Sequence, residues 1–330
     1  MLSALRPGPE RRPLIAVVGI NDATETTDYL MPTGILRRAD VADVLMLATG
    51  PGPVQLYPAL KVQPDATTAE FDATHPDGAD YVIVPAMSRD DDPIVLAWLQ
   101  EQSAKGARII AVCAGAKVVG AAGLLDGKRA TTHWYYLREL LQPHPSIDYV
   151  ADRRMVMDGN VVTTTGITAS MPMMLTLIEA LGGEGKAEAV ALNLGLDHWD
   201  ARHASEAFKF TRAFATGVLG NMLALWNREE LGIALEQGVD EVSLALVADA
   251  WSRTYRSKAI TYAMTSEIAS VGGVRIIPDR NVSEWAAPAT VPSFADHAPA
   301  GALDQTLEAI TARYGETTAQ VVAMQLEYPR

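Results

Sequence analysis

Cys113 is the only cysteine among 330 residues, and it lies where the apolar run ARIIAVC meets the small-residue run AGAKVVGAAG. A thiol at such a junction can serve as a nucleophile. The N–H groups of a following helix favour the thiolate and can stabilise a developing oxyanion. The alternative is structural, because a free cysteine is also a small apolar residue that is commonly buried.

The residues around Cys113 predict a nucleophile elbow, meaning a sharp turn from a strand into a helix. Such a turn holds its central residue in a strained conformation above the sheet, and small residues must follow it. Ala114, Gly115 and Ala116 meet that requirement, and Gly123 is expected to end the helix. Because the positive end of the helix dipole favours the thiolate, we expect a lowered pKa for Cys113.

Two further residues could assist a thiol. His133 lies twenty residues on, in RATTHWYY, and Asp28 is one of four acids near the first predicted strand–helix junction. Each has a structural alternative. A histidine among aromatic residues is often a hydrogen-bonded structural residue, and a carboxylate at a helix start interacts favourably with the dipole. Neither residue identifies a site by itself.

Strand and helix patterns alternate along the part of the chain that would position these residues. Continuous apolar runs predict strands at 13–20, 43–49, 79–87 and 107–113, and helices are predicted at 25–39 and 94–106. This alternation indicates a parallel sheet that is covered on both faces. A hairpin at 154–166, a helix at 171–181 and a helical run at 205–235 are expected to follow.

The chain also contains an internal repeat. Residues 175–197 align without a gap on residues 307–329, with nine of 23 positions identical. More weakly, 241–251 and 271–279 resemble 13–23 and 57–65. The second copy has no counterpart of the elbow. We therefore interpret residues 240–330 as a truncated half-copy and expect it to be chemically silent.

Composition narrows the class of protein. Hydrophobic residues make up 48% and charged residues 20% of the chain, which is ordinary for a globular protein. The formal net charge of −13 argues against a nucleic-acid partner. A single cysteine excludes an intramolecular disulfide, and neither a signal peptide nor a membrane span is predicted. The six histidines are scattered, so we expect no metal site. We also expect a cytoplasmic protein that uses no cofactor.

Two motifs resemble the ThiJ/PfpI superfamily, the class I glutamine amidotransferase-like group that includes the parkinsonism-associated deglycase and bacterial isocyanide hydratases. AVCAGA followed by AGLLDGKRATTHW is similar to its elbow region, and TDYLMPTGILRRA to its first helix, with Asp28 four residues before Pro32. The resemblance covers about residues 13 to 200. It implies that Cys113 is the nucleophile, that Asp28 hydrogen-bonds the sulfur and that His133 lies beside it.

The same resemblance implies the rest of the site. Ala114 would donate one oxyanion N–H from the elbow that Gly115 completes, Ala86 or Met87 would donate a second, and Thr132 and Trp134 would lie in the pocket. Many members have Gly-Gly where this chain has VPAMSRDDDP. The chain also lacks the Cys-His elbow of one branch, the His-x-Glu of the amidotransferases and the helix-turn-helix domain of the regulators.

These observations predict an α/β protein with a flavodoxin-like doubly wound sandwich, a mainly parallel sheet and a C-terminal truncated repeat. The site is expected at the C-terminal ends of the strands. The expected divisions are an N-terminal extension (1–12), a ThiJ/PfpI-like domain (13–204), a helical connector (205–239) and the half-copy (240–330).

The function predicted from these motifs is that of a cysteine enzyme of the hydrolase, hydratase or lyase type. Its substrate would be a small electrophilic molecule attacked by an activated Cys113 thiolate. The alternative is a non-catalytic redox sensor or ligand-binding protein, and a DNA-binding regulator is disfavoured. We expect a homodimer, unless the half-copy covers the dimer surface within one chain.

Overall fold

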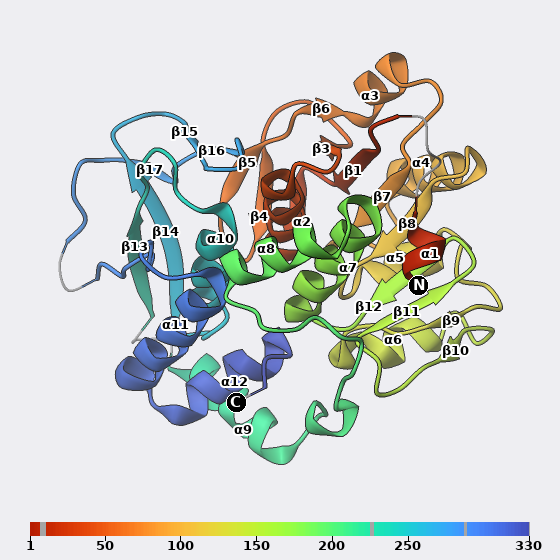
Figure 1. Ribbon diagram of the computed structural model, residues 1–330. Coiled ribbons are helices and arrows are strands. Elements are labelled where there is room, and N and C mark those ends of the chain that lie inside the picture. The colour runs from red at the N-terminus through yellow and green to blue at the C-terminus, as the bar shows by residue number, and fades with distance from the viewer. Residues whose placement is uncertain (7–10, 225–227, 287–288, 330) are drawn as a thin grey trace.

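The computed structural model describes residues 1–6, 11–224, 228–286 and 289–329, and its largest element is a seven-stranded sheet (Figure 1). The strand order is β11-β12-β8-β7-β1-β3-β6. The strands are β1 (Leu14–Gly19), β3 (Asp43–Ala48), β6 (Ala66–Thr67), β7 (Tyr81–Val84), β8 (Arg108–Ala111), β11 (Met155–Asp158) and β12 (Val161–Thr164). The β11–β12 hairpin is antiparallel and the other neighbours are parallel. The predicted α/β fold with a mainly parallel sheet is thereby confirmed.

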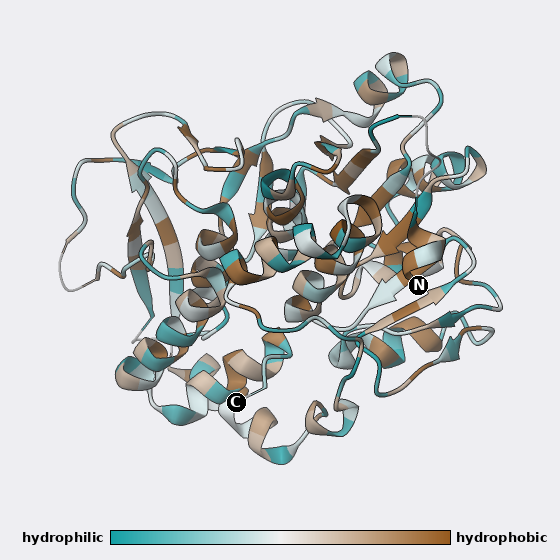
Figure 2. Ribbon diagram, in the orientation of Figure 1, coloured by the Kyte–Doolittle hydropathy of each residue, from teal (hydrophilic) through white to brown (hydrophobic). Residues whose placement is uncertain are grey.

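Helices cover both faces of this sheet, and Figure 2 shows its apolar strands enclosed between them. One face carries α2 (Thr26–Ala39), α7 (Ser170–Gly182) and α8 (Glu184–Leu194), and the other carries α3 (Thr68–Thr74), α4 (Pro93–Ala104) and α5 (Gly115–Ala121). Along β1, Ile15 and Val17 join the first core, whereas Ala16 and Val18 join the second. Burial on both faces explains why the strands are continuous apolar runs in the sequence.

Shorter elements complete this first part of the molecule. They are α1 (Leu2–Leu5), β2 (Asp22–Glu25), β4 (Val54–Tyr57), β5 (Lys61–Gln63), β9 (Arg129–Ala130), β10 (Asp148–Tyr149), α6 (Leu137–Leu141) and the 3₁₀ turns η1 (Trp134–Tyr136), η2 (Ile167–Ala169) and η3 (Ser205–Ala207). Within the predicted N-terminal extension, α1 contacts α7 and Leu5 is fully buried. Among the described residues, no helix has both the length and the apolar character that crossing a membrane requires.

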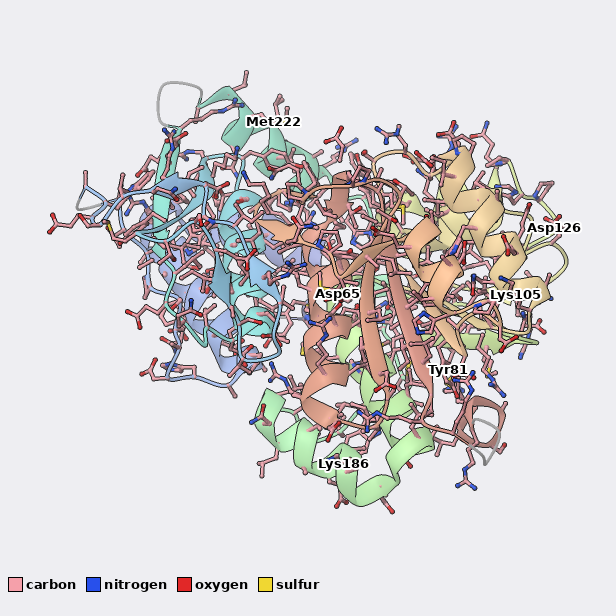
Figure 3. The ribbon with its side chains drawn as sticks, turned by 90° about the horizontal axis from the view of Figure 1, so that it is seen from above. Asp65, Tyr81, Lys105, Asp126, Lys186 and Met222 are labelled. Atoms are coloured by element: carbon pink, nitrogen blue, oxygen red, sulfur yellow. The ribbon has the colours of Figure 1, made fainter. Side chains whose placement is uncertain are left out.

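The C-terminal part forms a second, smaller α/β unit beside the first (Figure 3). Its parallel sheet has the order β13-β14-β17, and two further strands extend β5, β4 and β2 into a five-stranded sheet. The elements are α9 (Arg212–Leu223), β13 (Glu229–Ala234), α10 (Glu241–Ser252), β14 (Ser257–Ala263), β15 (Ile268–Ala269), β16 (Arg275–Ile276), β17 (Arg280–Asn281), α11 (Pro299–Tyr314) and α12 (Glu316–Leu326).

One prediction for this unit was wrong, because Glu229–Ala234 is a strand inside the run expected to be helical. The weak resemblance of 241–251 to 13–23 does not reflect a shared element, since Glu241–Ser252 is a helix. The residues from Glu241 to Trp251 are all buried, and a wholly buried helix has no polar face to reveal its period. Asp240 nevertheless signals the helix start, because its side chain accepts hydrogen bonds from the N–H groups of Val242 and Ser243.

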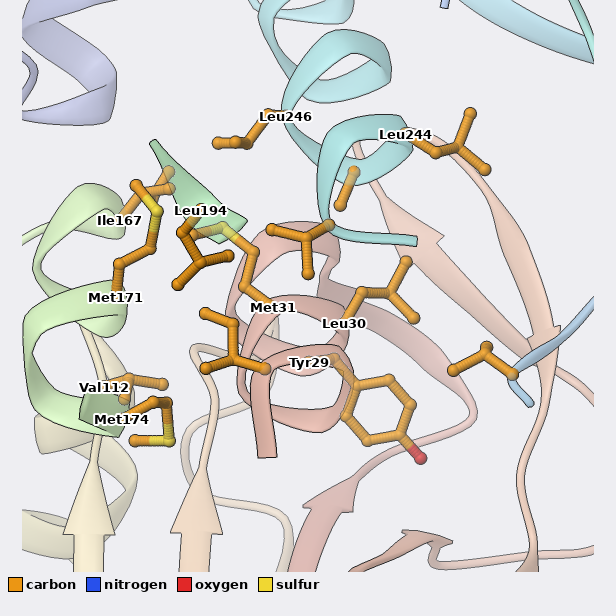
Figure 4. Packing of buried hydrophobic residues seen from close by; sticks show 14 of the residues in the cluster. Tyr29, Leu30, Met31, Val112, Ile167, Met171, Met174, Leu194, Leu244 and Leu246 are labelled. Atoms are coloured by element: carbon orange, nitrogen blue, oxygen red, sulfur yellow. The ribbon is translucent and has the colours of Figure 1, made fainter. Parts of the chain in front are cut away.

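The repeat itself is present in the structure. Both helix pairs, α7–α8 and α11–α12, are joined by a single glycine with nearly the same backbone angles: φ 88°, ψ 166° at Gly183 and φ 90°, ψ 161° at Gly315. The units meet where α2 contacts α10 and β5 pairs with β16. Figure 4 shows Leu244 and Leu246 of α10 in one cluster with Leu30 and Met31 of α2.

The half-copy therefore covers, within one chain, the α2 surface that we expected a second chain to contact. The homodimer stays a prediction, and a dimer of this protein would have to use other surfaces.

Candidate functional site

Cys113 lies in the predicted elbow, two residues after the end of β8. Its φ of 55° is left-handed, a strained conformation for a residue with a side chain. A Cβ at Gly115 would lie 2.0 Å from the Val84 carbonyl oxygen, so only glycine fits there. The Cys113 N–H donates to Thr164 Oγ1 over 3.2 Å, and Thr132 Oγ1 donates to the Cys113 carbonyl over 3.0 Å. These two hydrogen bonds hold Cys113 in place from two neighbouring segments.

The thiol differs from the predicted activated thiolate. Cys113 is only 3% exposed, and burial raises the pKa of its thiol well above the usual range, helped by the charges of Asp28, Glu25 and Glu327. A hydrogen bond from the Ala114 N–H to the sulfur opposes this rise in pKa. The helix start is therefore outweighed by desolvation and nearby carboxyl groups. The raised pKa favours the protonated thiol over the thiolate.

The charge of Asp28 acts on the Cys113 thiol, but the hydrogen bond expected between its carboxyl group and the sulfur is not present among the described residues. Asp28 is fully buried on α2, where burial and then the charge of Glu25 raise the pKa of its carboxyl group well above the ordinary value. Its Oδ2 accepts a hydrogen bond from the Ala86 N–H over 3.1 Å, whereas Oδ1 has no partner among the residues that the structure describes. A carboxyl group with a raised pKa and a free oxygen can exchange a proton with a neighbouring group.

The contact with Asp28 changes the expected role of Ala86. The sequence had suggested the Ala86 N–H as a possible oxyanion donor. In the structure this N–H donates to the Asp28 carboxyl group. Met87 lines the cavity next to Ala86, and its N–H is the candidate for the second oxyanion donor.

His133 reaches the site but is engaged on both ring nitrogens. Nδ1 accepts from the Tyr135 N–H over 3.2 Å, so Nε2 carries the proton and donates to the Gln325 carbonyl over 2.9 Å. Burial lowers the pKa of the ring, which favours its neutral form. A catalytic role for His133 stays a prediction, and its two hydrogen bonds support the loop that follows β9.

The C-terminal segment provides supports that the sequence analysis missed. Glu327 accepts from the Trp134 N–H over 2.8 Å and from the Gly166 N–H, and Trp134 Nε1 donates to the Met324 carbonyl over 2.9 Å. Glu327 has a left-handed φ of 50°, as Gly195 has at the equivalent position of the first copy. In the sequence, the alignment of Glu327 with Gly195 of the first copy was the feature that could have indicated a special role for Glu327.

A buried charge cluster also joins the half-copy to the site. Arg253, which follows α10, contacts Glu25 and Asp249 at 2.6 Å each, and the charge of Glu25 acts in turn on Asp28. Burial raises the pKa of Asp249 to about 7. Two buried carboxyl groups therefore contact one guanidinium group, whose charge also acts on Asp28. The chemical silence of the half-copy stays a prediction, but its Arg253 belongs to the charge cluster beside the candidate site.

A cavity of about 660 Å³ opens above the elbow. Six predicted site residues line it: Cys113, Ala114, Ala86, Met87, His133 and Trp134. Asp28, Gly115 and Thr132 are buried behind this lining. Residues from α9, Arg253, Tyr255 and Gln325 complete the walls, and no sequence motif had pointed to them. In the described part of the chain, no cluster of three or more His, Cys, Asp or Glu side chains is arranged to hold a metal ion.

Comparisons with known proteins agree with this arrangement. The chain is 45% identical over 104 residues to the isonitrile hydratase of Pseudomonas putida, a match that covers 32% of this chain and 44% of that protein. It is 28% identical over 181 residues to the Parkinson disease protein 7 homolog of Danio rerio, covering 53% of this chain and 93% of the relative.

Among solved structures, a cysteine mutant of a DJ-1 superfamily protein from Salmonella typhimurium matches with a TM-score of 0.50 and 26% identity, over 56% of this chain and the whole of that one. The model of the DJ-1/PfpI family matches residues 15–180, which contain the elbow, Asp28 and His133. Together with the elbow geometry, this match shows that the chain belongs to the DJ-1/PfpI family.

Proposed function

We propose that this protein is a cysteine enzyme that adds water to a small uncharged electrophile, with an isonitrile as the first candidate substrate. The observation that carries the proposal is the strained Cys113 at the floor of a cavity, beside a buried Asp28 whose Oδ1 is unpartnered. The similarity to an isonitrile hydratase supports hydration in particular, although the match spans less than half of that protein.

The chemistry can be balanced with these groups. The Cys113 sulfur forms a bond to the terminal isonitrile carbon while its proton passes through Asp28 to the same carbon, which gives a thioimidate. Water then adds to that carbon and a proton goes to nitrogen. When the carbon–sulfur bond breaks, the sulfur regains a proton and an N-substituted formamide leaves. The N–H groups of Ala114 and Met87 are the candidate donors to the oxygen of the tetrahedral intermediate.

The wild-type protein is expected to convert simple alkyl isonitriles to N-alkylformamides. In water enriched in ¹⁸O, one heavy oxygen should enter each formamide, because the oxygen comes from water. Intact-mass analysis of acid-quenched mixtures should reveal a Cys113 adduct that has gained the mass of one isonitrile. A protein that forms neither product nor adduct with any member of an alkyl and aryl isonitrile panel would contradict the hydratase proposal.

The redox-sensor alternative requires a thiol that oxidises readily, and reactivity with peroxide follows thiolate character and exposure. Because Cys113 is buried and its pKa is raised, we expect mild peroxide to leave it unmodified. Met264, an exposed side chain, provides an internal control and should gain oxygen first. Peptide mass spectrometry measures both sites. Oxidation of Cys113 ahead of Met264 would favour the sensor.

A further inference from the structure

We infer that the cavity selects uncharged electrophiles that carry an extended apolar body, and that α9 forms the selecting wall. This inference rests on the proposed function for the reacting group, but it concerns the rest of the substrate. It depends on three features of the described residues: how α9 is anchored, which side chains it directs into the cavity, and how the charges of the cavity are paired.

One side of α9 is fixed to the half-copy. Gly217 lets α12 approach closely, since a Cβ there would lie 2.8 Å from Val321 Cγ2. Thr318 of α12 donates to Asn221 over 3.0 Å, and Thr211 caps the N-terminus of α9 by accepting from the Phe214 N–H. The helix is therefore held in register and presents a defined opposite side.

That opposite side is apolar and lines the cavity. Phe214, Val218 and Met222 follow one another at four-residue spacing, as do Ala215 and Leu219, and all five line the cavity. Across from them lies the aromatic run of η1, with Trp134 in an edge contact to Phe214 at a centroid distance of 5.3 Å. An apolar body entering between α9 and η1 would be covered on both sides.

Several apolar side chains of the cavity lining are largely exposed in the described part of the chain. Phe210 is 67% exposed, Leu219 56% and Met222 45%, and Figure 3 shows Met222 on α9 at the edge of the molecule. Exposed apolar groups that converge on one cavity mouth are typical of a ligand-binding site. An apolar substrate body would remove this surface from water.

The charges in the cavity argue against an anionic substrate. Lys117 contacts Asp90 at 2.8 Å and Glu139 at 2.7 Å, and Arg253 is held by Glu25 and Asp249. Both cations of the lining are therefore already paired with carboxylates. A carboxylate or phosphate on the substrate would lose its hydration without gaining a free cation.

The test uses N-substituted iodoacetamides with methyl, butyl, hexyl and 5-carboxypentyl tails. Their second-order rate constants for alkylating Cys113 of the full chain are measured at pH 8 and divided by their rate constants with a free thiol. Each buried methylene contributes about 0.8 kcal/mol, a factor of about four. Allowing for partial burial, we expect the hexyl reagent to react at least about 30-fold faster than the methyl reagent, and the carboxypentyl reagent to fall back toward the methyl value.

Two matched variants place the selectivity on α9. Leu219→Asp should lower the hexyl-to-methyl ratio at least about tenfold, whereas Leu192→Asp, on an exposed position of α8 outside this cavity, should leave the ratio unchanged. If Leu219→Asp fails to fold, the reagent series with the wild-type protein still tests whether the cavity prefers an apolar tail. A ratio near one, a faster carboxypentyl reagent, or no alkylation of Cys113 by any reagent would overturn the inference. Tail selectivity without turnover would refute only the catalytic proposal, and turnover without tail selectivity would refute only this inference.

Discussion

Replacing Cys113 by alanine is expected to reduce kcat/KM at least about 10³-fold on every substrate that the wild-type protein converts, because it removes the sulfur proposed to form the covalent intermediate. The side chain is nearly fully buried and small, so the variant loses little packing and should unfold within a few degrees of the wild type. Steady-state kinetics and thermal denaturation measure the two effects. Unchanged turnover would return Cys113 to a structural role.

Asp28→Asn removes the proposed proton acceptor but leaves the Cys113 sulfur in place, and the same steady-state kinetics measure its effect. Asparagine keeps the shape and an oxygen for the Ala86 N–H, but it cannot receive a proton. We expect a 10²- to 10⁴-fold loss of turnover, the usual contribution of general acid–base catalysis, while Cys113 can still be alkylated by small reagents. A variant that keeps wild-type turnover would show that the proton moves by another route.

The elbow could be predicted because its requirements are local in the sequence. A left-handed residue at the end of a buried strand and a glycine two positions later leave a pattern within four residues, and the structure has Cys113 and Gly115 in those places. The strands and the hairpin are equally local, since their apolar runs and their turn at Gly159 follow directly from the sequence.

The protonation of the site could not be predicted from local sequence. The pKa of Cys113 depends first on its burial and then on carboxyl groups that lie far along the chain, at Asp28, Glu25 and Glu327. The role of His133 depends on a carbonyl at Gln325, 192 residues away. A helix start beside a cysteine indicates a lowered pKa only when such distant groups are absent. The folded chain supplies three of them.

The half-copy shows a different limit of sequence reasoning. Its last two helices could be recognised because they align without a gap and end at the same positions as their counterparts. The loss of the elbow from this copy suggested that it had no chemical role. A repeat without its own elbow can still contribute contacts to the first copy, however. Arg253 bonds to Glu25 and Glu327 accepts from the Trp134 N–H in this way.

Arg253→Met is expected to destabilise the protein by about 3–5 kcal/mol at pH 8, the usual cost of leaving a buried charge without its partner. The substitution keeps the volume but removes the only guanidinium group that contacts both Glu25 and Asp249 within the described residues. Urea denaturation at several pH values measures the loss. Arg280→Met, which breaks an exposed pair with Glu230, is the matched control and should stay within about 1 kcal/mol.

The pH dependence identifies the cause of this loss. In the wild type, burial raises the pKa of Asp249 from its ordinary value of 3.8 to about 7. Between these values the folded state holds a proton that the unfolded state has released, so this group contributes less stability as the pH rises. Without Arg253, whose charge lowers that pKa, the effect grows. The variant should therefore lose clearly more stability at pH 8 than at pH 5, and adding Asp249→Asn should recover part of it. An equal loss at both pH values would assign Arg253 to packing instead of charge.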